Sequence, residues 1–131
     1  MGLDMYVYQA RKKTHDQEVP AIIESSPIES LFEDVDDEFY YWRKHPDLHG
    51  WFEKLYRQKD GKKEFNMVFV NITLEDLEEL EQAILDNNLP FTAGFFFGAS
   101  TGKEKDGDLY FVDKAREALN QGYILYYMAW W

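Results

Sequence analysis

The chain is organised around YYWRKHPDLHGWF, residues 40–52. Five aromatic side chains, two cations and two of the three histidines fall within these thirteen residues. The residue before a proline avoids helical backbone, so the first half of the stretch is expected to be a strand end or a loop. Pro46 suits the first turn of a helix, where a backbone N–H would have no partner in any case. Apolar side chains then recur at helical spacing and predict a helix over residues 46–58, with one apolar stripe made of Leu48, Trp51, Phe52, Leu55 and Tyr56.

Length and composition indicate one packed domain. The chain has 131 residues, of which 45% are hydrophobic and 18% aromatic, enough to bury a core without disulfides or metals. It has no cysteine, which excludes disulfides and thiolate metal ligands and fits a reducing compartment. No apolar run approaches the roughly 18–20 residues of a membrane helix, and the start lacks the features of a signal peptide. We expect a single globular domain over residues 1–131, cytoplasmic and without a membrane partner.

The charge balance bears on the class of partner. The formal net charge is −11, which makes a nucleic-acid partner unlikely on electrostatic grounds, because lysine and arginine supply most of that affinity. The same charge disfavours anionic membranes and steers the protein toward basic partners. The simpler explanation of this net charge is that it keeps the protein soluble.

The segments before residue 40 carry mixed signals. Residues 3–9 alternate apolar and polar side chains, the period of a strand. Residues 19–23 contain Pro20, so they are expected to form an edge strand at most. Residues 26–29 indicate a capped turn or a short helical start. The acidic run at residues 33–38 then leads into the aromatic stretch.

The segments after residue 58 alternate between strand and helix signals. Strands are expected at residues 65–70, 91–97 and 123–130. Thr73 and Asp76 resemble a capping box at the start of a helix over residues 73–87, and a further helix over residues 109–121 ends at Gly122. Together these elements predict an α+β fold: a small, mainly antiparallel sheet of about four strands with about three helices packed on it.

Three short blocks stand in a fixed order along most of the chain. They are MGLDMY at residues 1–6, YWRK at residues 41–44 followed by His49 and Trp51-Phe52, and GFFFG at residues 94–98. Together they resemble a family of small phage and prophage proteins of uncharacterised function. The resemblance implies an accessory phage-type protein acting in a bacterial cytoplasm, and it implies no mechanism. The sequence departs from the family pattern after Lys44, where HPDL replaces a segment without proline.

The central stretch offers a possible anion pocket. Arg43 and Lys44 lie beside aromatic rings on which a guanidinium stacks, and the helix after Pro46 would point its first amides at an anion. The competing interpretation is that Arg43 neutralises the acidic run. The candidate ligand-binding residues are Tyr40, Trp42, Arg43, Lys44, His49 and Trp51.

Two other patterns suggest ligand sites and are weaker. His45 and His49 are four residues apart, a spacing that suits zinc on a helix, but the motif lacks its glutamate, so no metal is assigned. Residues 98–103, GASTGK, resemble a phosphate-binding loop, but only three residues separate the glycines where the motif has four. We therefore expect no cofactor.

Acidic side chains form two sets that are candidates for an interaction surface. On a partner with a basic groove they would imitate the phosphates of DNA; otherwise they form solvated faces. The sets are Glu33, Asp34, Asp36 and Asp37 before the aromatic stretch, and Glu75, Glu78 and Glu79 on the predicted helix.

Two classes of function follow from these observations. The first is a non-enzymatic acidic protein that binds a host or phage protein, with counter-defence and nucleic-acid mimicry as specific versions. The alternative is a domain that binds or hydrolyses a small ligand or nucleotide phosphate at residues 40–52. No thiol, G-x-S-x-G motif or Ser-His-Asp order supports an enzyme. Trp130 and Trp131 would form a homodimer contact if they are exposed.

Overall fold

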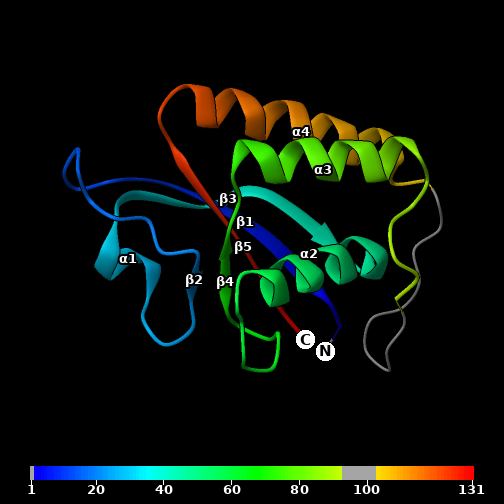
Figure 1. Ribbon diagram of the computed structural model, residues 1–131, viewed down its shortest axis with the longest axis horizontal. Helices are drawn as coiled ribbons and strands as arrows, with labels where there is room; N and C mark the ends of the chain where they lie inside the picture. The colour runs from blue at the N-terminus through cyan, green and yellow to red at the C-terminus, as the bar shows by residue number, and fades with distance from the viewer. Residues whose placement is uncertain (1, 93–102) are drawn as a thin grey trace.

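The computed structural model describes residues 2–92 and 103–131, which form five strands and four helices (Figure 1). In chain order they are β1 (Asp4–Arg11), β2 (Ile22–Ile23), α1 (Ile28–Leu31), β3 (Glu33–Arg43), α2 (Pro46–Gln58), β4 (Phe69–Asn71), α3 (Leu74–Leu85), α4 (Lys105–Asn120) and β5 (Ile124–Trp130). The strands form one sheet in the order β2-β4-β5-β1-β3, and every described pair is antiparallel.

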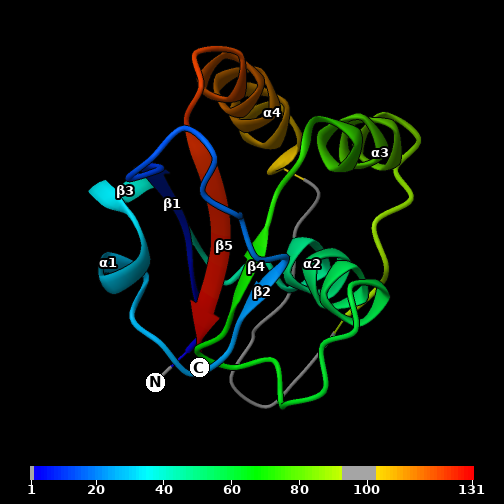
Figure 2. The same cartoon turned by 60° about the vertical axis from the view of Figure 1, so that its left-hand side comes forward.

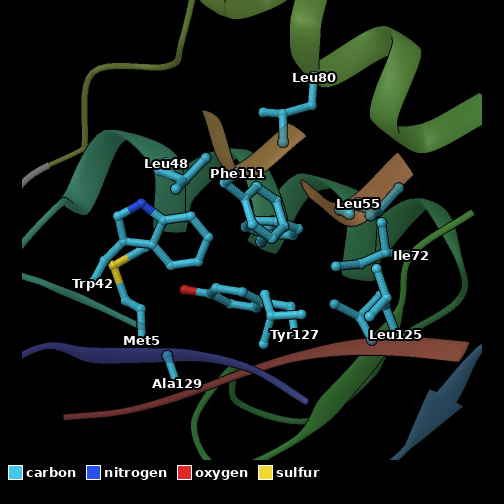
Figure 3. Close-up of a cluster of buried hydrophobic side chains, with 14 of the residues drawn as sticks. Met5, Trp42, Leu48, Leu55, Ile72, Leu80, Phe111, Leu125, Tyr127 and Ala129 are labelled. Carbon is cyan, nitrogen blue, oxygen red and sulfur yellow. The ribbon is translucent and has the colours of Figure 1, made fainter. Parts of the chain in front are cut away.

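The main core lies between one face of the sheet and the helices α2, α3 and α4. Alternate side chains of β1 and β5 point to this face, as the two-residue period of a strand requires. Figure 3 shows Tyr127 of β5 below Phe111 of α4, and Leu125 of the same strand pointing toward Ile72 and Leu55. The helices α3 and α4 lie side by side over the sheet in both views (Figures 1 and 2).

A smaller core lies on the other face of the sheet. Figure 2 shows α1 across the strands from α2 and α3. Ile28 and Phe32, from α1 and its end, pack there against Ile124 and Tyr126 of β5. Because α1 has only four residues, it covers one end of this face and leaves the other end open.

The predicted class is confirmed, since antiparallel strands and packed helices make an α+β fold. The helix beginning at Pro46 ends at Gln58 as expected, and Thr73 and Asp76 form the capping box. The short strand Ile22–Ile23 lies at the sheet edge, as Pro20 indicated. Gly122, with φ of 93°, follows α4, and the N–H groups of residues 122 and 123 bond the carbonyls of 119 and 118.

The acidic run at residues 33–38 and the first half of the aromatic stretch were predicted to be separate segments, and this was wrong. They form one strand of eleven residues, β3. The five strands of the sheet include β3 and the short edge strand β2, and they do not include Phe91 and Thr92. Pairing between β1 and β3 shifts register between Val7 and Gln9 and again between Gln9 and Arg11. Each shift marks an irregularity of the β-bulge kind, which breaks the alternation that identifies a strand in sequence.

Three other boundaries were also wrong. Residues 65–68 lie outside β4, because Met67 adopts a positive φ of 61° and turns the chain. Phe91 and Thr92 are not in a strand, and residues 93–97 fall outside the described part. The helix α4 begins at Lys105 rather than near residue 109, although Gly107 and nearby charges are typical of a loop.

Gly61 tests the packing beneath α2. A Cβ atom on Gly61 would lie 2.4 Å from ring carbons of Tyr56, which is fully buried. We expect Gly61→Ala to lower the free energy of unfolding by about 1–3 kcal/mol because the ring has no room to move. Urea denaturation measures the change.

The matched control is Gly107→Ala in α4, where the nearest side-chain atom is 3.7 Å away. This substitution should be neutral or stabilise the protein by up to about 1 kcal/mol, since alanine favours a helix. Equal destabilisation by both variants would contradict the packing argument.

Candidate functional site

Neighbouring residues of β3 point to opposite faces of the sheet. Trp42 is buried in the main core, whereas Arg43 is exposed and its Nε lies 3.8 Å from Asp4 Oδ1. Tyr41 shares the outer face and its hydroxyl donates to the same Asp4 oxygen at 2.5 Å. Trp42 and Arg43 therefore do not form one pocket.

Trp42 instead belongs to a buried polar cluster with His45 and Asp108. Its Nε1 donates to Asp108 Oδ1 at 3.1 Å, and His45 Nε2 lies 2.7 Å from Asp108 Oδ2. His45 and Asp108 are 3% and 2% exposed. Asp108 lies in the first turn of α4, where the helix dipole stabilises a carboxylate. The cluster joins β3, the start of α2 and the start of α4.

A hollow of about 150 Å³ adjoins this cluster. Asp47 lines it, and one oxygen of this carboxylate accepts a hydrogen bond from the backbone N–H of Thr92 at 2.9 Å. His45 Nδ1 lies 4.0 Å from Glu104 Oε2. The described residues that line the hollow are His45, Asp47, Ile84, Asn87, Leu89, Glu104, Lys105 and Asp108.

His49 lies in the main core, away from Arg43. Its Nδ1 is 2.8 Å from the Tyr127 hydroxyl, and its ring stacks on Phe65 with centroids 5.0 Å apart. Burial lowers the pKa of His49 to about 4, so the imidazole is neutral at pH 7. The side chains of His45 and His49 thus contact different partners, and among the described residues no group of three histidine or acidic side chains is arranged to hold a metal ion.

The other predicted ligand-binding residues also separate. The Tyr40 hydroxyl donates to the Gly107 carbonyl at 3.1 Å, which attaches β3 to α4. Lys44 is exposed with φ of 57°. Trp51 is half-buried and its ring contacts Phe52 edge-on. The phosphate-loop pattern falls on residues 98–102, outside the described part, and on the exposed Lys103.

The two acidic sets lie on different parts of the molecule. Figure 2 shows β3 and α3 at opposite sides of the view. All seven side chains are exposed: Glu33, Asp34, Asp36 and Asp37 on β3, and Glu75, Glu78 and Glu79 on α3.

The sequence did not bring together one group of mainly aromatic side chains, which lies on the outer face of the sheet toward the Arg43 end of β3, the end away from Glu33. Tyr41 and Trp130 are 46% and 49% exposed, and Tyr6 lies between β3 and β5 with Tyr41 and Met128 as its pairing partners. We call Tyr6, Tyr41, Met128 and Trp130 the open sheet face. The alternation of residues 3–9 indicated part of this face, because the two-residue period of a strand turns Tyr6 away from the core side on which Met5 is buried. For Asp108 no local signal existed.

The comparisons give no family for this chain. No protein-family model, curated protein or solved structure matches it. Within the part that the structure describes, the helices are too short or too polar to cross a bilayer.

Asp108 tests the buried polar cluster. We expect Asp108→Ala to lower the free energy of unfolding by about 3 kcal/mol, because the indole N–H of Trp42 loses its acceptor and His45 loses the carboxylate. Asp108→Asn keeps one carbonyl oxygen and should have a smaller effect. The control Asp106→Ala, exposed on the same turn, should change stability by less than about 1 kcal/mol. Equal losses at 106 and 108 in chemical denaturation would contradict this role.

His49 predicts a pH dependence of stability. An unfolded histidine has its pKa near 6.5 and that of folded His49 is about 4, so the unfolded chain binds more protons between these values. The contribution of His49 to the free energy of unfolding is at its full value above pH 6.5. As the pH falls from 6.5 toward 4, the free energy of unfolding decreases by about 3 kcal/mol. Urea denaturation of the wild type and His49→Gln from pH 7 to 4 isolates the effect, and identical pH slopes would contradict it.

Proposed function

We propose that this protein is a non-enzymatic binding protein of the cytoplasm that attaches to a basic segment of another protein. Its interface is the acidic end of β3 together with the open sheet face. The observation that carries the proposal is the place of β3 at an edge of the sheet, where Glu33, Asp34, Asp36, Asp37 and Glu38 are all exposed.

The electrostatics of this edge support a basic partner. Within the described part of the chain, Asp34 is the one of these five side chains that forms an ion pair. Its Oδ2 lies 3.8 Å from Arg11 Nε. The remaining carboxylates add to a surface field that attracts cations and speeds their encounter with the protein.

The irregular pairing of β3 bears on how a partner attaches. Two register shifts and the positive φ of Asp34, 53°, bend the acidic half of the strand. Bulges and charges at a sheet edge hinder the addition of another strand. The partner is therefore expected to contact side chains rather than to extend the sheet.

Exposed aromatic side chains favour binding over solubility alone. Carboxylates suffice to keep a protein in solution, but they do not account for Tyr41 and Trp130, which expose about half of their surface on the open sheet face. Aromatic residues are enriched at protein interfaces, and adjoining exposed rings mark such sites.

The finer versions of the function stay sequence-based predictions. A phage-type role and counter-defence depend on the family resemblance. Nucleic-acid mimicry by both acidic sets draws no support from their separation on the molecule (Figure 2). For the homodimer contact, Trp130 is half-exposed, whereas Trp131 donates its Nε1–H to the Phe65 carbonyl at 3.1 Å.

Two variants that remove the same number of charges, one on β3 and one on α3, distinguish binding by a specific surface from binding that depends only on the net charge. One variant carries Glu33→Gln, Asp36→Asn and Asp37→Asn on β3; the control carries Glu75→Gln, Glu78→Gln and Glu79→Gln on α3. We expect the β3 variant to bind a fluorescent peptide of mixed lysine and arginine about tenfold more weakly, because three charge contacts are lost. The α3 variant should bind like the wild type, and all affinities should fall as salt rises.

Equal weakening by both variants would reduce the effect to net charge and contradict the proposed interface. A pull-down from bacterial lysate with the same proteins extends the test to natural partners. A partner that resists salt but is lost with Arg43→Ala would restrict the interface to the aromatic part of β3 and exclude its acidic end.

The alternative function is a small-ligand or nucleotide-phosphate site near residues 40–52. It is favoured by the hollow beside the His45–Asp108 pair, which Lys105 also lines. Acidic side chains predominate around that hollow, so it is less suited to phosphate than the predicted anion pocket. A thermal-shift screen with nucleotides and inorganic phosphate would favour this alternative if one of them stabilises the wild type in the absence of any peptide effect.

A further inference from the structure

The open sheet face adjoins a hollow of about 410 Å³ that is lined by Tyr6, Glu38 and Tyr41. It lies where β1 and β3 run beyond the cover of α1. Tyr6 and Tyr41 are directly paired across these strands, and their ring centroids are 5.1 Å apart with planes inclined by 50°. Two tilted rings and one carboxylate thus converge on one exposed place.

The Tyr41 ring is held by a contact outside the hollow. The Tyr41 hydroxyl donates to Asp4 at 2.5 Å, which fixes the ring against β1. This hydrogen bond raises the pKa of Tyr41 to about 12, so the phenol keeps its proton at pH 7. The site is thereby preorganised, which lowers the entropy lost when a ligand binds.

The charge around the hollow is negative. Glu38 lines it and is exposed, and Asp36 and Asp37 precede it on β3. Burial raises the pKa of Tyr8, the next outward side chain of β1, and the negative charges of Asp37 and Glu29 raise it further. The nearby cation, Arg43, lies 3.8 Å from Asp4, which offsets its charge.

Aromatic faces and a carboxylate are the groups that recognise an organic cation. The ring quadrupole attracts a cation over its face, and a carboxylate pairs with the N–H groups. A guanidinium is planar, stacks on rings and is weakly hydrated, so it fits two tilted rings better than a compact ammonium does.

We propose that the hollow formed by Tyr6, Tyr41 and Glu38 receives an arginine side chain of the partner protein. This inference rests on the proposed function and adds a point of recognition to it. The guanidinium stacks against the tyrosines and donates to the Glu38 carboxylate, while the acidic end of β3 attracts the flanking basic residues.

The test uses a small probe, so that it does not depend on the identity of the partner. N-acetyl-arginine methylamide is titrated into the protein, with the isosteric neutral citrulline compound and the lysine compound as controls. NMR of the tyrosine rings reports binding. We expect saturable shifts of the Tyr6 and Tyr41 signals with the arginine compound, several-fold weaker binding of lysine, and no saturation with citrulline.

Variants then separate ring, hydroxyl and charge. Tyr41→Leu and Glu38→Gln should each weaken binding of the arginine compound by about fivefold. Tyr41→Phe keeps the ring but loses the hydrogen bond to Asp4 that orients it, so binding should weaken by about two- to threefold, less than in Tyr41→Leu. Tyr110→Leu, at a tyrosine that is 62% exposed on α4, is the matched control and should have no effect.

Two results would overturn the inference: equal binding of arginine and citrulline compounds, or unchanged affinity in both Tyr41→Leu and Glu38→Gln. Equal affinity for the lysine compound would overturn the assignment to arginine. If the basic peptide binds through β3 while the arginine compound fails, the hollow is excluded and the proposed function stands. If the arginine compound binds while the β3 and α3 variants bind the peptide equally, the proposed interface fails instead.

Discussion

The stacking of Phe52 on Tyr127 fixes the helix layer to the centre of the sheet. Their ring centroids are 3.9 Å apart and their planes differ by 7°. One helical turn earlier, His49 bonds the hydroxyl of the same tyrosine. Two contacts to one side chain determine both the position and the rotation of α2. The start of that helix consequently meets α4, which is where His45 reaches Asp108. Apolar packing and buried polar contacts therefore depend on each other here, because neither the imidazole nor the phenol would be satisfied if α2 rotated.

The strand β3 divides its residues between two tasks. Its inward side chains, Phe39 and Trp42, complete the main core, and its outward side chains, Tyr41 and Arg43, contact Asp4. Near its start, the irregular pairing leaves consecutive carboxylates in solvent. A regular strand would turn every second one of them toward the core, at a large desolvation cost. The irregularity is thus what allows an acidic run to belong to a sheet.

Local signals predicted the elements that depend on local contacts. Pro46 and the apolar period after it gave α2 its bounds, and Thr73 with Asp76 marked the start of α3. The strand β3 was not predicted because its pairing with β1 is non-local and irregular. For the candidate site, the sequence pointed to Trp42, Arg43 and His49 but did not show that their side chains point to different places. Residues 40–43 were expected to form a strand end or a loop, whereas they lie within β3, in which the side chains of Trp42 and Arg43 face opposite sides of the sheet. Asp108 lies 63 residues after His45, and no spacing rule connects them.

The place of β5 in the sheet has a consequence for how the chain folds. It follows the other four strands in sequence, yet it lies between β4 and β1. In the strand order, β5 joins two pairs that do not otherwise contact through the sheet, β1 with β3 and β2 with β4. Contacts between residues as far apart as Asp4 and Trp130 close slowly, because the loop entropy is lost before packing compensates for it.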